Sequence, residues 1–530
     1  MKAEYEEHDA ILIARCMMQI KAKFDTDEGL SFIQQKYINQ GLKKFGDDGK
    51  DAVDKELRQM LLRDCFTPEF VKDMTASERK KAQSAMMLLA EKQFEKTIKG
   101  RLVFRGDGTC EWLSREDTAS PTASQEAITT TCVIDAHEGR DIMTLDVPNA
   151  FIQTYMPDAK EGEDRIYMKI TGMMVQILID MAPEYCKYVV LENGKRVIYV
   201  RQTIRFHVDD LMSSHMDPKV NDKFTEWLNM RYGLIQACKV VRGKIHRYLG
   251  MTLDVSVNGK LKIRMDDYVK NMLEDFPIKF NKDSKQETPA GNDLLEAGKE
   301  KLLNAEYRQI FHTTVARGLY VSKRARLDIH PTITILASRV REPTESDWKK
   351  CVRMMQYLFC TLLYHLTLSA ESLQVMKWMI DASFAVHPDF KSHTGGTLSF
   401  GGGAAQVMSK KQKLNSRSST EAELIAVDNV VTMILWTKLF MEWQGYPIEK
   451  NILYQDNKSA ILLEENGRKS AGKRSGAMNI RYFFITDQVE KGNVKIKYCP
   501  TDNMTADFMT KPLQGERFCK FRDLILGPQD

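Results

Sequence analysis

The sequence lacks the paired cysteines that mark a zinc module or a disulfide framework. Its ten cysteines are scattered, with no C-x-x-C pair and no cluster of Cys and His. This distribution argues against both kinds of site and for reduced thiols inside a cell. Tandem repeats and low-complexity tracts are missing as well.

A secretion signal and a long apolar run are also absent. The first residues, MKAEYEEHDAILIARCMM, are acidic where a signal peptide carries positive charge. The apolar run VVTMILW stops at Lys438, well short of the roughly 20 residues that a membrane-spanning helix needs. We therefore predict neither secretion nor membrane insertion.

The composition is that of an ordinary globular protein, with 43% hydrophobic and 28% charged residues over 530 positions. A chain of this length is too long for one compact core, so several domains are expected. The net charge of +5 permits a polyanionic partner without demanding one.

Helices are predicted up to about residue 98. Val53, Leu57 and Met60 share one helix face, and Thr75 with Glu78 gives a capping box before RKKAQSAMMLLAEKQF. Strands are predicted next, around RLVF, DIMTLDV, RVIYVRQTIRFHV and YLGMTLDVSVNGKLKIRM, the last a hairpin turning at Asn258-Gly259. This part of the chain should therefore form a mixed α/β domain.

The polar stretch KDSKQETPAGNDLLEAGKE is predicted to be a linker, and helices resume after it with a start signal at TESD. From Met376 the pattern changes to strands, a long helix from Thr420 to Trp443, and further strands. This order predicts a second α/β domain.

Acidic residues of the last region fall at strand ends and helix starts: Asp381, Glu423, Asp456 and Asp507. Two-metal phosphoryl transfer needs three or four such carboxylates from distant segments, holding two Mg²⁺ ions about 4 Å apart. Each acid also has an ordinary structural explanation. Asp381 and Asp456 fit turns, Glu423 fits a capping box with Thr420, and Asp507 fits a helix N-terminus.

The stretch from Met376 to about Gly527 resembles the ribonuclease H domain of copia-type retrotransposon polyproteins, through SSTEAELIAV, YQDNKSAI, NIRYFFITDQV and DFMTKPLQGE. The resemblance implies that the four acids are metal ligands. It selects Glu423 rather than Glu421, because Glu423 begins the ELIA string.

Two basic stretches flank this acidic set in predicted loops and are candidates for gripping the phosphates of a hybrid. They contain Lys410, Lys411, Lys413, Arg468, Lys469, Lys473 and Arg474. A solubilising loop explains the same residues equally well.

Two adjacent aspartates, Asp209 and Asp210, follow a strand-like run in RFHVDDLMSSHMDP. Taken alone they fit a turn as well as a metal site, because successive strand side chains point to opposite faces. The stretch resembles the aspartate-pair motif of copia-type reverse transcriptases, and DIMTLDVPNAFIQTYMP resembles their first palm motif. The resemblance implies that Asp146, Asp209 and Asp210 bind metal. It also places Phe151 where a ring blocks a ribose 2′-hydroxyl, although an aromatic at this spacing is otherwise often a core residue.

Two further stretches extend the resemblance. HRYLGMTLDVS is similar to the strand pair that holds the primer. IKGRLVF is similar to a fingers strand, and this implies that Lys99 and Arg101 meet the nucleotide triphosphate. Basic residues on an exposed strand also occur without a specific role.

The chain departs from the family between its two aspartate motifs. His207 replaces the usual tyrosine, and the stretch like LYGLKQ with its following helix is missing where VIYVRQ runs directly into TIRFHVDD. The sequence therefore predicts an incomplete palm with an internal deletion near residues 202–203. A decayed genomic copy, or a gene model that skipped an interval, would produce it.

We expect a multidomain protein of the α/β and α+β classes. The predicted parts are an N-terminal helical segment leading into fingers (1–98), reverse transcriptase fingers and incomplete palm (99–280), thumb and connection helices (281–370), and a ribonuclease H-like mixed five-stranded sheet with helices (371–530).

The resemblance implies an RNA-directed DNA polymerase with ribonuclease H activity, and the missing stretch predicts that the polymerase part is defective. It implies two Mg²⁺ ions per active site and, as partners, an RNA template, a DNA primer, an RNA–DNA hybrid and deoxynucleoside triphosphates. The location would be intracellular, nuclear or in cytoplasmic particles. Two alternatives remain: an inactive remnant that binds nucleic acid through its basic loops, and a purely structural α/β protein with turn carboxylates.

Overall fold

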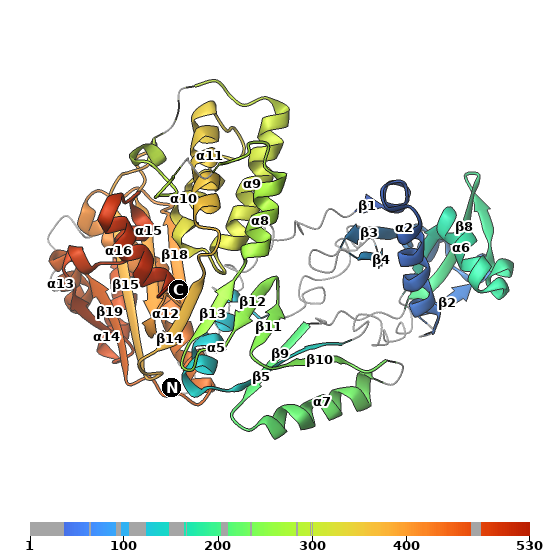
Figure 1. The fold of residues 1–530 in the computed structure, drawn as a ribbon, viewed down its shortest axis with the longest axis horizontal. Coiled ribbons are helices and arrows are strands. Elements are labelled where there is room, and N and C mark those ends of the chain that lie inside the picture. Colours follow the sequence, from blue (N-terminus) through green and yellow to red (C-terminus); the bar gives the residue numbers. More distant parts are fainter. Residues whose placement is uncertain are drawn as a thin grey trace.

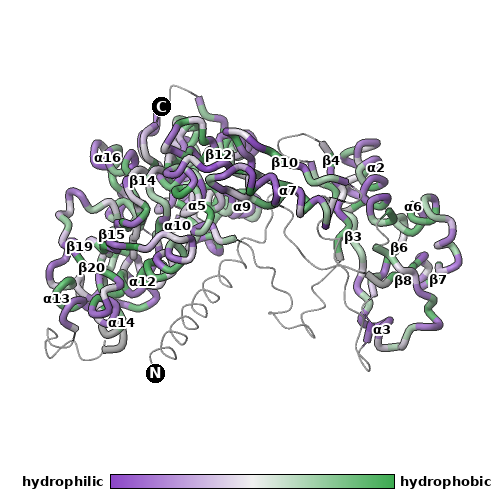
Figure 2. Tube along the Cα trace, turned by 90° about the horizontal axis from the view of Figure 1, so that it is seen from below, coloured by the Kyte–Doolittle hydropathy of each residue, from purple (hydrophilic) through white to green (hydrophobic). Residues whose placement is uncertain are grey.

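The computed structural model describes residues 36–62, 65–91, 97–104, 123–147, 164–165, 167–202, 210–233, 236–281, 285–296, 298, 300–467 and 479–529. Two lobes are visible in both views (Figures 1 and 2). The smaller lobe contains the first described elements and also residues 167–202, so the chain crosses between the lobes more than once.

The smaller lobe is built on a seven-stranded sheet in the order β1-β3-β6-β8-β2, with β4 paired to β3 and β7 to β8. Helix α2 (Ile38–Leu62), kinked at Gly46, and helix α6 (Met173–Met181) contribute to one buried cluster with this sheet. The strands are β1 (Lys36–Tyr37), β2 (Phe66–Glu69), β3 (Gln83–Glu91), β4 (Ile98–Phe104), β6 (Tyr167–Thr171), β7 (Val190–Glu192) and β8 (Lys195–Gln202).

The predicted helix after Thr75 ends much earlier than expected. Thr75 and Glu78 form the predicted capping box, but α3 covers only Ala76–Lys81, and Gln83–Glu91 is the strand β3. The prediction of a helix through this stretch is therefore wrong. Alternate side chains of β3 are buried on one face, and the strand pairs with β1, β4 and β6. Three strand partners and this burial outweigh the helix propensity of Ala, Met and Leu.

In the larger lobe, β10 (Lys239–Arg242), β5 (Asp141–Asp146) and β9 (Asp210–His215) form an antiparallel three-stranded sheet in that order. Helix α7 (Pro218–Tyr232) packs Leu228 against Met143 and Leu145 of β5. Helix α5 (Gln125–Glu138) supports β9, because Ser214 Oγ donates a hydrogen bond to Asp135 Oδ1 at 2.5 Å.

A second sheet of the larger lobe runs in the order β11-β12-β13-β14-β17. The predicted hairpin at Asn258-Gly259 joins β12 to β13, and Gly259 takes the left-handed φ of +73° that the turn requires. The strands are β11 (Ile245–Tyr248), β12 (Met251–Asp254), β13 (Leu261–Arg264), β14 (Leu366–Ala370) and β17 (Gly401–Gly402).

The helices of the middle region pack beside this sheet (Figure 1). Helix α11 begins at the predicted start signal, where Thr344 and Asp347 form a capping box. The helices are α8 (Asp266–Asp275), α9 (Ala305–Ser322), α10 (His330–Ala337) and α11 (Glu345–Cys360). Short 3-10 turns are η1 (Val71–Asp73), η4 (Pro183–Tyr188), η5 (Asn292–Leu295), η6 (Leu327–Ile329) and η9 (Thr501–Asn503).

The last sheet, called the C-terminal sheet below, has five strands in the order β18-β16-β15-β19-β20. Strand β15 runs parallel to β19 and β19 parallel to β20, whereas β16 is antiparallel to β15 and to β18. The predicted mixed five-stranded sheet is thereby confirmed. Its strands are β15 (Val375–Ser383), β16 (His393–Ser399), β18 (Gln406–Lys411), β19 (Lys450–Gln455) and β20 (Lys495–Tyr498). Its helices are α12 (Ser419–Trp443), α13 (Lys458–Asn466), α14 (Asn479–Glu490), α15 (Asp507–Thr510) and α16 (Gly515–Leu526).

Among the described residues, α12 alone has the length and apolar composition that would allow a helix to cross a membrane. The expectation that no run is long enough is therefore wrong, because the helix continues through Lys438, which pairs with Glu442 at 2.7 Å. The helix lies against β15 and β16. Within its most apolar stretch of 18 residues, 56% is buried in the lobe. This burial is typical of a core helix.

One hydrophobic core runs through the larger lobe, from Ile128 of α5 to Leu526 of α16. A buried amide also joins distant elements: Gln406 Nε2 on β18 donates to Thr130 Oγ1 of α5 at 3.2 Å and to Thr437 Oγ1 of α12 at 3.0 Å. The C-terminal sheet therefore shares its interior with a helix from much earlier in the chain, and the predicted domain boundaries stay predictions.

Candidate metal sites

Three of the predicted acids meet at one edge of the C-terminal sheet. A carboxylate oxygen from each of Asp381, Glu423 and Asp456 lies within 4.8 Å of the others. Asp381 belongs to β15, and Asp456 directly follows the parallel strand β19. The carboxyl ends of neighbouring parallel strands open at the same edge, so the topology brings these two acids together.

The third acid comes from the helix that crosses the sheet. Ser418 caps α12 by accepting a hydrogen bond from Glu421 N, and Glu421 Oε2 accepts one from Arg417 N. Glu421, not Glu423, is therefore the acidic residue of the helix cap. Glu423 lies half a turn further on, is 4% exposed, and faces Asp381 and Asp456.

The three carboxylates are poorly compensated by protein groups. Burial, Lys511 and Asp507 are the largest influences on Asp381, and the net effect raises its pKa to about 6. Burial also raises the pKa of Glu423 well above its ordinary value, with the charges of Asp381 and Asp456 adding to the effect. Oε2 of Glu423 is buried without a hydrogen-bond partner in the described part of the chain.

This donor set fits a hard divalent cation. Mg²⁺ prefers carboxylate oxygens, and a cation between three carboxylates would satisfy the orphaned oxygen and reverse the raised pKa values. Asp456 is half-buried and also accepts a hydrogen bond from Thr501 Oγ1 at 2.8 Å, which fixes its orientation.

The fourth predicted acid, Asp507, is fully buried but already paired. Lys511 Nζ lies 2.5 Å from its Oδ1, and an Arg517 Nη lies 2.6 Å from its Oδ2. The same short helix holds Asp381, because Thr510 Oγ1 donates to Asp381 Oδ2. Asp507 is thus beside the cluster of three acids, with its charge compensated by two cations.

The predicted polymerase acids are brought together by strand register. Asp146, at the end of β5, is the direct antiparallel partner of Asp210 at the start of β9. Opposite residues of an antiparallel pair have Cβ atoms about 5 Å apart. Asp146 is exposed, and its partner on the other side is Lys239 of β10. Asp209 and Phe151 lie outside the described residues.

Two of the predicted nucleotide-binding residues lie in the other lobe. Lys99 and Arg101 are exposed on β4, whereas Asp146 is in the larger lobe (Figure 1). Both bases lower the pKa of Glu56 on α2, a group whose pKa burial raises overall. In this structure the charges of Lys99 and Arg101 act on Glu56, and the two side chains do not lie beside Asp146.

The predicted basic loops are described in part. Lys411, at the end of β18, pairs with Asp389 at 2.8 Å, and Lys410 and Lys413 beside it are exposed. The second loop falls outside the described residues, with Arg468, Lys469, Lys473 and Arg474.

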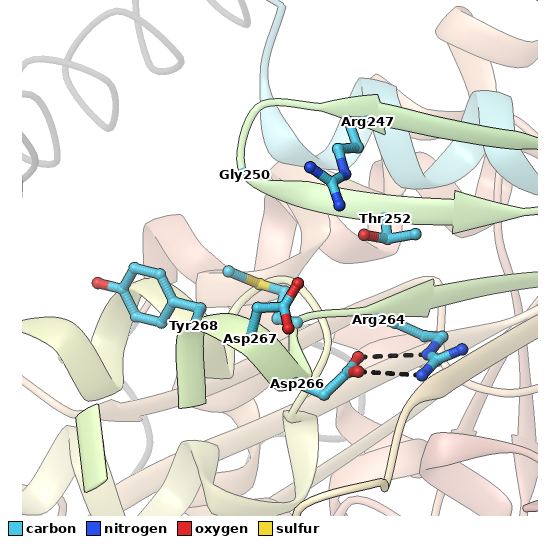
Figure 3. A pocket seen from close by; sticks show the side chains of 8 residues that line it. Arg247, Gly250, Thr252, Arg264, Asp266, Asp267 and Tyr268 are labelled. Atoms are coloured by element: carbon cyan, nitrogen blue, oxygen red, sulfur yellow. Dashed lines mark hydrogen bonds and ion pairs between the residues drawn. The ribbon is translucent and has the colours of Figure 1, made fainter. Parts of the chain in front are cut away.

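A small cavity of about 170 Å³ lies at the strand pair predicted to hold a primer. Arg247 of β11 and Thr252 of β12 face it from one side, and the start of α8 closes the other (Figure 3). Arg264 and Asp266 form two hydrogen bonds at its rim, of 3.2 and 3.0 Å. The cavity therefore combines positive charge with hydroxyl and carboxylate groups.

Comparison with known proteins shows what this chain is similar to. It is 24% identical over 463 residues to the Retrovirus-related Pol polyprotein from transposon TNT 1-94 of Nicotiana tabacum, covering 81% of this chain and 34% of the relative. The Pol polyprotein from transposon RE1 of Arabidopsis thaliana is 24% identical over 81% of this chain and 30% of the relative. The Transposon Ty1-H Gag-Pol polyprotein of Saccharomyces cerevisiae is 22% identical over 88% of this chain and 28% of the relative.

Its homologues are Ty1/copia-type Gag-Pol polyproteins. The chain spans about a third of the length of these relatives. No protein-family profile matches it. Among solved structures, prototype foamy virus protease–reverse transcriptase aligns with 88% of this chain and 55% of its own, at 13% identity. Its TM-score of 0.23 is too low to support an argument about the fold.

Sequence reasoning missed the cations beside Asp507. The spacing of Asp507 and Lys511 is a local signal for a helical ion pair, because residues four apart lie on one helix face. Arg517 comes from the next helix, α16, and no local pattern connects it to Asp507. Glu464, a fully buried carboxyl that adds to the raised pKa of Glu423, was missed for the same reason.

Proposed function

We propose that this chain carries the reverse transcriptase and ribonuclease H parts of a copia-type retrotransposon polyprotein, and that the C-terminal sheet cleaves the RNA strand of an RNA–DNA hybrid. The convergence of Asp381, Glu423 and Asp456 from three separate elements carries the proposal. The relatives named as Pol polyproteins support the same reaction class.

The proposed chemistry is hydrolysis of a phosphodiester bond. Two Mg²⁺ ions, when bound, would activate the attacking water and stabilise the leaving oxygen. Asp381, Glu423 and Asp456 would hold this charge at the sheet edge. Thr510 and Thr501 orient two of the three carboxylates through hydrogen bonds, so the ligand geometry is fixed before a cation arrives.

In the three-stranded sheet we infer a second site for nucleotidyl transfer, formed by Asp146 and Asp210 with Asp209. The direct pairing of Asp146 with Asp210 supports it. An RNA template, a DNA primer and deoxynucleoside triphosphates would be its partners, with the cavity at Arg247 and Thr252 beside the primer. We propose that polymerisation is defective, since the family stretch between the two aspartate motifs is missing.

The decisive test is a pair of substitutions in the full-length chain. A fragment starting at Leu368 would divide β14 and remove α5 from the core, so it is a poor test object. Asp456→Asn keeps the size of the side chain and the acceptor for Thr501, but removes the charge that holds the metal. Cleavage of hybrid RNA should fall by about a thousandfold or more.

Glu421→Gln is the matched control, because glutamine still accepts the hydrogen bond from Arg417 N at the helix cap. This variant should cleave at nearly the parent rate. An unchanged rate for Asp456→Asn, or loss of cleavage for Glu421→Gln, would refute the ligand assignment. Salt-sensitive binding of hybrid by a parent chain that cleaves nothing would instead favour an inactive nucleic-acid-binding remnant.

A further inference from the structure

The four acids of the C-terminal sheet divide into two unequal groups. Asp381, Glu423 and Asp456 gather around one point. Asp507 has both oxygens engaged by Lys511 and Arg517. Among the described residues, these two bases are the cations found within 4 Å of any of the four acids.

Lys511 does more than neutralise Asp507. Its Nζ lies 2.5 Å from Asp507 Oδ1 and 3.7 Å from Asp381 Oδ2, so one ammonium group bridges the two carboxylates. A second metal ion, held about 4 Å from the first in two-metal sites, would use ligands of both groups. The lysine therefore stands between the acids that a second ion would have to share.

Electrostatic repulsion prevents the Lys511 ammonium group and a second metal ion from occupying this position together. A divalent cation within about 4 Å of an ammonium group meets strong repulsion in a partly buried site. Glu423 and Asp456, together with Asp381, can still take one divalent cation, because Glu423 Oε2 has no hydrogen-bond partner among the described residues. A second cation beside Asp507 would gain little binding energy, because Lys511 and Arg517 already neutralise this carboxylate.

We propose that Lys511 holds the place of the second metal ion in the absence of substrate, so that this site binds a single divalent cation until a hybrid arrives. The inference rests on the proposed function and specifies how that site is loaded. The ammonium group is at the end of a flexible stem and its side chain is 40% exposed, so it can swing toward solvent. The anionic phosphate of the hybrid gives it a new partner, and Arg517 continues to hold Asp507.

Lys511 is thus a positioning residue, and a purely structural ion pair would not change the number of bound ions. Isothermal titration with Mn²⁺ measures that number directly. The chain to use is full-length protein with Asp146→Asn and Asp210→Asn, which silence the other predicted site. Ions that disappear on adding Asp381→Asn are assigned to the C-terminal sheet.

The parent background should bind one ion at the C-terminal sheet, and Lys511→Met should bind two. The first ion should bind Lys511→Met about tenfold more tightly than it binds the parent, because a nearby positive charge is gone. Lys511→Arg keeps the charge and should bind one. Lys438→Met is the matched control, because it removes an i,i+4 ion pair of α12 that the acids do not share, and it should also bind one. Two ions on the parent, or one on Lys511→Met, would overturn the inference.

A second measurement needs no change at Lys511. An uncleavable hybrid with a 2′-O-methyl RNA strand, added to the same parent background, should raise the number of ions at this sheet from one to two. An unchanged number would overturn the inference. If no ion binds with or without hybrid, the proposed metal site itself fails, and the inference with it.

Discussion

The acids of the C-terminal sheet and those of the three-stranded sheet are held by different kinds of structure. Asp381, Glu423 and Asp456 come from two strands and a helix that are far apart in the chain, and two of them are almost completely buried. Asp146 and Asp210 are direct register partners in a single strand pair, and Asp146 is exposed.

The difference shows what long-range convergence adds. Burial between several elements raises the pKa values of Asp381 and Glu423, which creates a demand for a cation. A strand pair alone sets the distance between Asp146 and Asp210, but it does not bury the carboxylates so that they require a cation. The C-terminal site should therefore depend on the whole larger lobe, whereas the other pair depends on the strands beside it.

The largest expected effect is a difference between hybrid cleavage and primer extension by the same protein. Full-length protein with Mg²⁺ should cleave the RNA of a hybrid but extend a primer on an RNA template little or not at all. The reason is the missing family stretch between Asp146 and Asp209. A primer-extension assay and a hybrid-cleavage assay on the same preparation test this. Robust full-length extension would show that the sheet at Asp146 works without the missing stretch.

A second prediction concerns pH and the free energy of unfolding of the metal-free chain. Glu464 of α13 is fully buried, and neither carboxylate oxygen has a hydrogen-bond partner among the residues that the structure describes. Burial raises its pKa to about 8. The folded chain therefore keeps a proton that the unfolded chain releases above about pH 4. The contribution of Glu464 to the free energy of unfolding is greatest below that pH and should fall by about 3 kcal/mol between about pH 5 and about pH 7.

Glu464→Gln should remove this fall, as measured by urea unfolding at several pH values. Asp135, the buried acid beneath β9, provides the comparison. Burial raises its pKa to about 6, but Ser214 donates a hydrogen bond to it. Its contribution should be smaller and complete by about pH 6. An equal pH dependence for Glu464→Gln and the parent would contradict the assigned burial.

The smallest effect tests whether the two regions are independent. Gln406→Met keeps the volume but removes the hydrogen bonds to Thr130 and Thr437. Thr437 Oγ1 still donates to Met433 O, whereas Thr130 Oγ1 loses the buried amide that donates to it. The larger lobe should lose about 1–3 kcal/mol of unfolding free energy. Gln309→Met on the exposed face of α9 is the control and should change stability by less than about 0.5 kcal/mol. A neutral Gln406→Met would indicate that α5 and the C-terminal sheet are only loosely coupled.

Features fixed by local sequence were predicted well. The capping box at Thr75, the helix start at Thr344 and the hairpin at Gly259 are present, because each depends on residues within a few positions. The helix expected over Gln83–Glu91 was wrong, since the choice of a strand depends on partners from β1, β4 and β6. Local propensity does not contain that information.

The candidate site shows the same division. Family motifs pointed to the four acids, and the structure gathers three of them. The pairing of Asp507 with Arg517 arises from the packing of two helices, and the isolation of Glu464 from the packing of α13. Both are properties of tertiary burial, which no spacing along the sequence specifies.

The packing of α5 on the C-terminal sheet has a consequence for synthesis on the ribosome. Thr130 and its partner Gln406 are 276 positions apart in the chain. At a translation rate of roughly 5–20 residues per second, α5 is synthesised on the order of 15–60 seconds before β18. During that time the contact between α5 and β18 is missing, although α5 also packs on β13 and β14, which emerge earlier. Premature termination before β14 would therefore leave the apolar side of α5, with Ile128, Val133 and Ile134, exposed as a target for chaperones and proteases.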